Sequence, residues 1–229
     1  MNKNLAAVIV AGGTGSRMGG DIPKQFLKIN GKEIISHTLS VFENCSFIDK
    51  IIIVCHGDYL DLCKELSKGI KKDVQVIKGG KTRQESVYLG IKEVSDTKYV
   101  MVHDAVRCLV EIPHIEKLYN ELLKGNSCTL AVKVKDTIKE ADENNLVVST
   151  PERSRLWQIQ SPQAFLTSEL LSAHKYALEN GFEGTDDCSL MEYCGKKIVL
   201  VEGSYKNIKI TTKSDIEIAK VFMKGSENK

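Results

Sequence analysis

The chain has 229 residues, 42% of them hydrophobic and 27% charged, a composition typical of a globular protein with a substantial core. Its 32 basic and 30 acidic residues give a formal net charge of +2, which argues against the basic surface of a general nucleic-acid-binding protein. No apolar run approaches the roughly 18 residues of a membrane span, and the first residues lack the cleavage pattern of a signal peptide.

The chain contains seven cysteines. Their odd number and the absence of a C-x-x-C motif argue against a disulfide framework and against a zinc cluster. Most of them lie in apolar contexts, where a free cysteine behaves as a small hydrophobic residue. We therefore expect reduced, buried thiols in a cytoplasmic protein.

The first predicted element is a strand at residues 5–10, which runs directly into a glycine-rich loop. The loop reads Ala11-Gly12-Gly13-Thr14-Gly15-Ser16 and is followed by Arg17 and Lys24. Glycine lets the backbone approach a ligand closely, and successive backbone N–H groups in such a loop can form a concavity that binds anions. The two cations favour a polyphosphate ligand, such as a nucleoside triphosphate, over a plain strand-to-loop turn.

The spacing of these glycines excludes the two common phosphate-binding loops. A dinucleotide-binding fingerprint needs G-x-G-x-x-G, and Met18 stands where the third glycine belongs. A P-loop needs Gly-Lys-Ser/Thr at its end, whereas Asp21 and Ile22 follow Gly20. A dinucleotide-dependent oxidoreductase is therefore disfavoured.

Strand-like apolar runs alternate with helical patterns along the first half of the chain. Further strands are predicted at 51–55, 74–77 and 99–103. Helical spacing is found at 34–42, after the capping motif at 82–85, and behind Pro113. Strands separated by helices predict an α/β fold with a mostly parallel, twisted sheet. We expect a single domain over residues 1–225 and a frayed tail at 226–229.

The alternation stops at about residue 133. Residues 133–162 are polar, contain short strand-like pieces such as 146–148, and show no clear helix. We interpret this segment as an arm, built on a hairpin, that projects from the domain. Helical spacing returns at about 167–178, a last strand is predicted at 198–201, and Thr212 caps the terminal helix.

A second pair of glycines, Gly79 and Gly80, follows a predicted strand and opens a helix. A helix N-terminus preceded by glycines can bind an anion or a nucleobase, and the hydroxyl of Ser86 could face such a ligand. An ordinary capped helix, with Lys81 and Arg83 in solvent, explains the same pattern equally well.

The motif His103-Asp104-Ala105-Val106-Arg107 ends a strand that we expect to be central. Ligands of parallel sheets bind at the carboxyl ends of strands, and Mg²⁺ usually takes one or two carboxylates plus substrate phosphates. We therefore favour Asp104 as a metal ligand, with Arg107 near a phosphate, over a surface ion pair between the two. His103 is interpreted as structural.

Other charged residues are ambiguous by themselves. Arg153 and Arg155 lie in the arm and could reach an anion, even across a dimer, or could simply be solvated. The sequence Thr185-Asp186-Asp187 looks like a helix N-cap followed by acidic first-turn residues. Lys209 alternates with Ile208 and Ile210 in a strand-like segment, so it points either to a phosphate or to solvent.

No Ser-His-Asp or Cys-His arrangement of a nucleophile can be assembled at a familiar spacing. This absence fits nucleotidyl transfer, a reaction carried by positioning and charge neutralisation.

Taken together, these motifs resemble one enzyme family. The loop from Ala11 to Gly19, with Pro23-Lys24-Gln25-Phe26, is similar to the signature of the sugar-phosphate nucleotidyltransferases. The remaining motifs, over about residues 5–222, are similar to the 2-C-methyl-D-erythritol 4-phosphate cytidylyltransferases of the non-mevalonate isoprenoid pathway. These are His37-Thr38-Leu39, Gly79-Gly80 with Arg83, Ser86 and Val87, His103 to Arg107, Asp136 to Lys139, Leu156-Trp157, Gln160 to Gln163, Thr185 to Asp187 with Glu192, and Asn207 to Lys209.

The resemblance implies a single Rossmann-like nucleotidyltransferase domain that transfers CMP from CTP to the acceptor phosphate, with Mg²⁺ or another divalent cation bound by Asp104. It implies catalytic roles for Arg17, Lys24 and Lys209. It implies CTP contacts from Ala11, Gly12, Gly13, Thr14, Gly15, Ser16, Gly80, Arg83, Ser86, Asp104 and Ala105. It implies acceptor contacts from Arg107, Thr137, Arg153 and Thr185. A homodimer is expected, in which the arm of one subunit reaches the site of the other, with no nucleic-acid or membrane partner.

The chain departs from the family at three positions: Cys108 stands in place of the usual proline, Val106 of alanine and Ser161 of threonine. None has an assigned chemical role, so these changes concern local loop shape. Two alternatives are kept. Ribitol-5-phosphate cytidylyltransferases share the glycine loop, and a non-catalytic nucleotide-binding subunit could share the fold. Arg17, Lys24 and Asp104 argue for an active enzyme.

Overall fold

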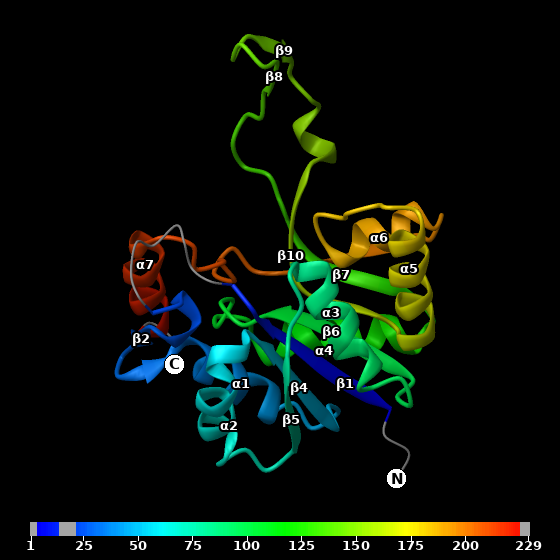
Figure 1. The fold of residues 1–229 in the computed structure, drawn as a ribbon. Helices are drawn as coiled ribbons and strands as arrows, with labels where there is room; N and C mark the ends of the chain where they lie inside the picture. Colours follow the sequence, from blue (N-terminus) through cyan, green and yellow to red (C-terminus); the bar gives the residue numbers. More distant parts are fainter. Residues whose placement is uncertain (1–3, 14–21, 225–229) are drawn as a thin grey trace.

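A seven-stranded sheet forms the centre of the fold (Figure 1). The structure, a computed structural model, describes residues 4–13 and 22–224. The strands lie in the order β11-β7-β10-β6-β1-β4-β5. Their bounds are β1 Leu5–Ala11, β4 Lys50–Cys55, β5 Asp73–Lys78, β6 Tyr99–Asp104, β7 Ser127–Lys133, β10 Trp157–Leu166 and β11 Ile198–Glu202. Of these strands, β10 alone runs antiparallel to its neighbours, so the predicted mostly parallel α/β sheet is confirmed.

The central strands form where the sequence has continuous apolar runs. Strands β1, β4 and β6 are buried on both faces because helices cover the sheet from both sides. The strands predicted at 5–10, 51–55, 74–77, 99–103 and 198–201 are all present. Strand β7 was not predicted.

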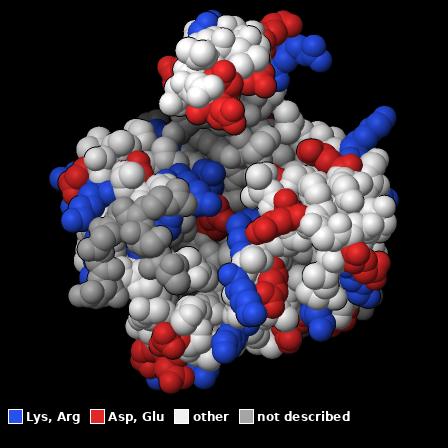
Figure 2. Space-filling view, turned by 45° about the horizontal axis from the view of Figure 1, so that its top comes forward, with Lys and Arg blue, Asp and Glu red and all other residues white. Residues whose placement is uncertain are grey.

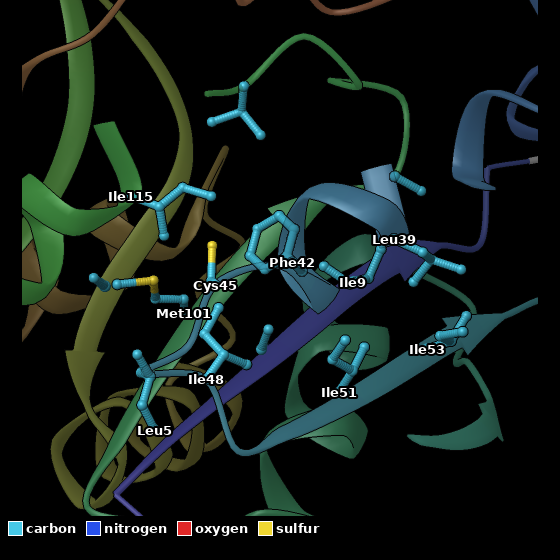
Figure 3. Close-up of a cluster of buried hydrophobic side chains, with 14 of the residues drawn as sticks. Leu5, Ile9, Leu39, Phe42, Cys45, Ile48, Ile51, Ile53, Met101 and Ile115 are labelled. Carbon is cyan, nitrogen blue, oxygen red and sulfur yellow. The ribbon is translucent and has the colours of Figure 1, made fainter. Parts of the chain in front are cut away.

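Helices form a layer on each face of the sheet. Their bounds are α1 Ile34–Glu43, α2 Leu60–Ser67, α3 Arg83–Lys92, α4 Ile112–Leu123, α5 Thr167–Glu179, α6 Asp187–Tyr193 and α7 Lys213–Lys224. Helices α1, α2 and α4 pack on one face, and α3, α5 and α6 on the other. Figure 3 shows the first of these cores, in which Phe42 of α1 and Ile115 of α4 meet Met101 of β6. Such burial excludes water from apolar surface and stabilises the fold.

The capping of α3 is only partly as predicted. The Thr82 side chain accepts a hydrogen bond from the Glu85 N–H at 3.1 Å, which confirms Thr82 as the N-cap. The Glu85 carboxylate, however, accepts from the Lys81 N–H at 2.7 Å, not from that of Thr82. Helix α6 is capped by Asp186 and not by Thr185, the first residue of the predicted pattern: the Asp186 carboxylate accepts from the Ser189 N–H, and the Ser189 hydroxyl accepts from the Asp186 N–H.

A long segment projects from the sheet between β7 and β10 (Figure 1). At its tip β8 (Glu140–Ala141) pairs with β9 (Val147–Ser149), and the turn η4 (Arg153–Arg155) leads back to the body. The predicted arm is present, but its predicted limits of 133–162 are wrong at the C-terminal end. Residues 157–162 belong to β10 in the central sheet, where they pair with β7. We use "arm" below for residues 134–156.

Smaller elements lie around the loop that follows β1. They are η2 Lys24–Phe26, β2 Lys28–Ile29, β3 Lys32–Glu33 and η3 Gly57–Tyr59. Helix α7 lies beside β2 (Figure 1). The predicted tail, 226–229, lies outside the described residues.

All seven cysteines are free thiols, and six of them are buried. Burial raises the pKa of Cys45 to about 11 and that of Cys128 to about 12, so both thiols are protonated at neutral pH. This agrees with the expectation of reduced, buried cysteines, whereas the cytoplasmic location stays a prediction. Within the described ranges, no helix combines the length and apolarity needed to cross a membrane.

Candidate active site

The candidate site lies where the direction of chain winding reverses. From β1 the chain passes to β4 and β5 on one side, and then returns to β6 on the other side of β1. Ligands of open α/β sheets bind at the carboxyl ends of strands at such a point. Here Ala11 ends β1 and Asp104 ends β6, with Val10 and Asp104 opposite each other in the parallel register. The topology therefore brings the glycine loop and Asp104 together.

A cavity of about 380 Å³, called the first cavity below, opens at this point. Figure 2 shows lysine and arginine side chains gathered around a hollow on the face below the arm. Many of the predicted site residues line the first cavity, namely Ala11, Gly12, Gly13, Lys24, Gly80, Arg83, Ser86, Asp104 and Lys209. The structure thus joins residues that the sequence analysis assigned from four separate segments.

Gln25 holds the start of the glycine loop in place. Its side chain is buried, and its amide nitrogen donates to the carbonyl oxygens of Ala11 at 2.7 Å and Gly13 at 3.0 Å. These bonds satisfy carbonyls that have left the sheet and leave the neighbouring N–H groups for a ligand. The sequence analysis gave Gln25 no role, since nothing local indicates where its amide points.

Ser86 joins α3 to the second glycine pair. Its hydroxyl donates to the Thr82 carbonyl at 2.8 Å and accepts from the Gly80 N–H at 3.1 Å. A Cβ atom at Gly79 would lie 2.7 Å from the Ser86 Oγ, so glycine is needed for this close approach. Ser86 lines the first cavity, as predicted, and also shapes the loop beside it.

Asp104 is the electrostatic centre of the site. Lys209 Nζ lies 2.8 Å from its Oδ2, Arg83 Nε lies 3.4 Å from its Oδ1, and Arg107 Nε lies 3.7 Å from Oδ2. Burial raises the pKa of Asp104, but the positive charges of Arg83, Lys209 and Arg107 outweigh it and hold the pKa well below its usual value. Asp104 is therefore ionised at neutral pH.

Lys209 reaches Asp104 from a loop, because residues 207–210 do not form the strand that their alternation suggests. Ile210 is buried, whereas Lys209 points toward Asp104 and borders both cavities. The role of Lys209 at a phosphate stays a prediction.

A second cavity, of about 270 Å³, shares Arg83, Asp104 and Lys209 with the first. Its other walls include Arg107, Gln163, Thr185 and Asp186. Arg107 Nη1 donates to the Asn207 carbonyl at 2.9 Å, which fixes the guanidinium at the cavity edge. Two cavities that share one carboxylate and two cations, with Arg107 beside them in the second, can hold two phosphate-bearing ligands side by side.

His103 supports this edge from inside the fold, in line with its predicted structural role. Its ring is fully buried, and burial lowers its pKa to about 3, so it is neutral. Nε2 donates to the Arg107 carbonyl at 3.2 Å, and Nδ1 lies 3.0 Å from the Ser161 hydroxyl. The Ser161 Oγ also accepts from the Asp104 N–H at 3.1 Å.

Several predicted residues do not line either cavity. Ala105 is buried in the core, and its carbonyl accepts from the Thr38 hydroxyl at 2.8 Å; its CTP contact stays a prediction. Thr137 and Arg153 lie exposed on the arm. The predicted roles of Thr14, Gly15, Ser16 and Arg17 fall outside the described residues.

A larger cavity lies elsewhere in the described part of the chain. It measures about 790 Å³ and lies between α5 and α6, where Tyr176 and Tyr193 line it. None of the predicted site residues borders it. We therefore place the chemistry at the two charged cavities around Asp104.

The model of the 2-C-methyl-D-erythritol 4-phosphate cytidylyltransferase (IspD) family matches residues 5–225 of this sequence. The chain belongs to this family. The predicted membership is thus confirmed, and with it the prediction that the chain is a nucleotidyltransferase.

Relatives and solved structures agree with this family. The chain is 42% identical over 225 residues to the 2-C-methyl-D-erythritol 4-phosphate cytidylyltransferase of Desulforamulus reducens, covering 96% of each chain. It is 44% identical over 218 residues to that of Bacillus cereus, covering 94% of this chain and 96% of the relative. The crystal structure of 4-diphosphocytidyl-2C-methyl-D-erythritol synthase from Anaerococcus prevotii is similar with a TM-score of 0.88 and 30% identity, over 97% of each chain. The fold of this IspD-family chain is therefore the nucleotidyltransferase fold that the sequence predicted.

Proposed function

We propose that the chain transfers the cytidylyl group of CTP to 2-C-methyl-D-erythritol 4-phosphate, giving 4-diphosphocytidyl-2-C-methyl-D-erythritol and pyrophosphate. The reaction belongs to the non-mevalonate route to isoprenoid precursors. The observation that carries the proposal is the position of Asp104 with Lys209, Arg83 and Arg107 at the junction of two cavities, in a chain that matches this family over almost its whole length.

The first cavity suits the nucleotide. Its glycine backbone at 11–13 and the start of α3 offer N–H groups to phosphate and base. Lys24 and Lys209 line the same cavity and supply the positive charge that a triphosphate requires. Arg17, which lies outside the described residues, is proposed to act with them.

The second cavity suits the acceptor. An acceptor phosphate near Arg107 and Lys209 would present an oxygen to the α-phosphorus of CTP. A P–O bond forms to that oxygen, the bond to the β-phosphate breaks, and pyrophosphate leaves with the electron pair. Lys24 and Lys209 would stabilise the negative charge that spreads over the α-phosphate oxygens in the transition state. Thr185 lines the same cavity and is proposed to contact the acceptor's hydroxyl groups.

The residues present fit a divalent cation that is completed by the substrate. The described part of the chain has no group of three or more His, Cys, Asp or Glu side chains that could hold a metal ion. Asp104 is a single ionised carboxylate at the nucleotide cavity, which suits Mg²⁺ bound by one carboxylate plus substrate phosphates. Bound there, the ion would neutralise phosphate charge. Lys209 would then turn from Asp104 to the phosphate.

The acceptor site is proposed to be completed by a second copy of the chain. Arg153 and Thr137 lie on the arm, away from both cavities of their own chain. The arm also exposes Leu146, Val147 and Val148, of which 61–65% of each residue's surface is accessible. Burial of these apolar side chains would stabilise a dimer in which each arm reaches the partner's site.

Mixing two inactive variants tests this arrangement. Arg153→Ala protein and Lys24→Ala protein, unfolded and refolded together, should recover about a quarter of wild-type activity, because half of the dimers are mixed and each has one intact site. The matched control is Arg155→Ala, which changes the other arginine of η4, mixed with Lys24→Ala in the same way. It reports effects of a substitution on the arm itself. Absence of recovery, with mixed dimers verified by mass spectrometry, would show that Arg153 acts within its own chain.

The proposed function is tested by pyrophosphate release from CTP, measured in parallel with 2-C-methyl-D-erythritol 4-phosphate and with D-ribitol 5-phosphate. We expect kcat/KM to be much higher for the methylerythritol acceptor. Preference for ribitol phosphate would support the alternative function in the same superfamily. Absence of turnover with either acceptor would favour the non-catalytic alternative.

A further inference from the structure

Asp187 is a buried carboxylate that was predicted only as an acid in the first turn of a helix and that has no role in the proposed chemistry. It is the first residue of α6, only 1% of its surface is exposed, and it lines neither cavity. A carboxylate is rarely buried unless a positive partner compensates the loss of hydration. We therefore expect a positively charged partner next to Asp187.

The partner of Asp187 is Arg83, the first residue of α3. Arg83 Nη2 lies 2.9 Å from Asp187 Oδ2, while its Nε faces Asp104 Oδ1 at 3.4 Å. One guanidinium thus bridges a buried carboxylate behind the site and the carboxylate at its centre. Arg83 also borders both cavities, so its position determines where positive charge lies at their junction.

Asp187 is itself held from two other elements. His174 of α5 places Nε2 3.4 Å from Asp187 Oδ1, and this ring stacks on Tyr88 of α3 with centroids 5.9 Å apart. From β10, the Gln163 side-chain oxygen accepts from the Asp187 N–H at 3.0 Å. Burial raises the pKa of Asp187, but the charge of Arg83 and the contact with His174 outweigh it and lower the pKa, so the carboxylate is ionised.

A second link joins the same two helix starts. The Gln84 amide donates to the Phe182 carbonyl at 3.1 Å and accepts from the Gly184 N–H at 2.9 Å. The start of α3 borders the first cavity, and the loop before α6 borders the second through Thr185 and Asp186. The Arg83–Asp187 ion pair and these two hydrogen bonds therefore connect the chain segments that border the first and the second cavity.

We propose that Asp187 is a positioning residue for nucleotidyl transfer: it holds the Arg83 guanidinium at the junction of the two cavities and so shares Arg83 with Asp104. Asp187 acts through Arg83 and touches no substrate. Without its charge, the Arg83 guanidinium would be attracted by Asp104 alone and would move away from α6, toward Asp104. The inference rests on the proposed function, because it concerns the same site.

The test compares Asp187→Asn, Asp187→Glu and Arg83→Met with the wild type. Asp187→Asn keeps the shape and removes the charge, and we expect kcat to fall about tenfold or more, since removing one partner of a buried ion pair leaves the other charge uncompensated. CTP affinity, measured by calorimetry without acceptor, should fall as well. Asp187→Glu keeps the carboxylate and should retain most of the wild-type kcat and CTP affinity. Glu179→Gln, an exposed carboxylate at the end of α5, is the control and should behave as wild type.

The decisive readout is the coupling between the two residues. In the Arg83→Met background, adding Asp187→Asn should change kcat and CTP affinity by less than twofold, because the group that Asp187 holds is already absent. A role confined to the stability of α6 would give the same loss in both backgrounds, and that result would overturn the proposal. Full kcat and CTP affinity in folded Asp187→Asn would also overturn it.

Two safeguards keep the test decisive. If Asp187→Asn alone does not fold, the double variant, which removes both charges of the pair, and Asp187→Glu still carry the comparison. In that case the proposal would be contradicted by a tenfold loss of kcat in folded Asp187→Glu, or by a double variant with lower kcat and CTP affinity than Arg83→Met.

CTP affinity also separates the proposed role of Asp187 from the proposed function of the enzyme. If CTP binds with the expected coupling but no methylerythritol phosphate is converted, the proposed acceptor is wrong while the role of Asp187 stands.

Discussion

Replacing Asp104 by asparagine is expected to lower kcat/KM roughly 10³-fold, on the scale of the several kcal/mol that a metal contributes at a reacting phosphate. The substitution keeps the shape of the side chain and removes the only carboxylate that faces both cavities among Arg83, Arg107 and Lys209 in the described chain. The divalent cation would lose its proposed protein ligand. The measurement is steady-state turnover at saturating Mg²⁺.

The fold should survive this change because each of the three cations around Asp104 keeps a second partner or access to solvent. Arg83 retains Asp187, Arg107 retains the Asn207 carbonyl, and Lys209 is partly exposed and can turn to solvent. Asp96→Asn, which alters an exposed carboxylate just before the other end of β6, is the matched control. Thermal unfolding of both variants reports on stability. Turnover within threefold of wild type in Asp104→Asn would remove this carboxylate from the proposed chemistry.

Replacing Lys24 by alanine is expected to reduce kcat by roughly 10²–10³, the usual loss when one group that stabilises transition-state charge is removed. Lys24 begins η2 and borders the first cavity beside the glycine backbone. Because the charge on the α-phosphate oxygens grows in the transition state, we expect kcat to change more than KM for CTP. Single-turnover kinetics with radiolabelled CTP would separate the chemical step from binding.

Lys28→Ala provides the control for Lys24. Lys28 is four residues further along, is largely exposed and pairs with Glu33 at 3.3 Å. Its loss should leave turnover close to wild type, since surface ion pairs contribute little. If Lys24→Ala raised KM for CTP and left kcat unchanged, Lys24 would be a ground-state binding residue and its proposed catalytic role would be wrong.

Hydrophobic pattern predicted the parts of the fold in which apolar burial determines structure. The strands at β1, β4, β5 and β6 and the helices at α1, α4 and α5 were predicted in this way. Strand β10 was not predicted, because its first half is polar and was assigned to the arm. Those polar side chains are satisfied within the fold: the Gln160 amide donates to the Ser204 carbonyl, and the Ser161 hydroxyl accepts from the Asp104 N–H. A buried polar strand is stabilised by distant partners, which a local pattern does not contain.

The site residues also divide into those that a local sequence pattern indicates and those that depend on distant partners. The glycine loop, Asp104 and Lys209 carry local signals, such as glycine spacing, a strand end and alternation. Gln25 belongs to the family signature and Asp187 resembles a first-turn acid, but no local signal indicates their contacts, because each acts through a partner that only the fold brings near. Thr137 and Arg153 were predicted from family resemblance alone. Their proposed role needs a second chain, so the fold of one chain leaves them on the arm.

The central claim is that the acceptor phosphate attacks the α-phosphorus of CTP directly, with the charges around Asp104 in place of a protein nucleophile. The most direct test uses one diastereomer of CTP that carries sulfur on the α-phosphorus, with 2-C-methyl-D-erythritol 4-phosphate as acceptor. The configuration of the product is then determined by ³¹P NMR. A single in-line displacement predicts inversion at phosphorus. Retention would require two displacements through a nucleotidyl-protein intermediate and would contradict the account.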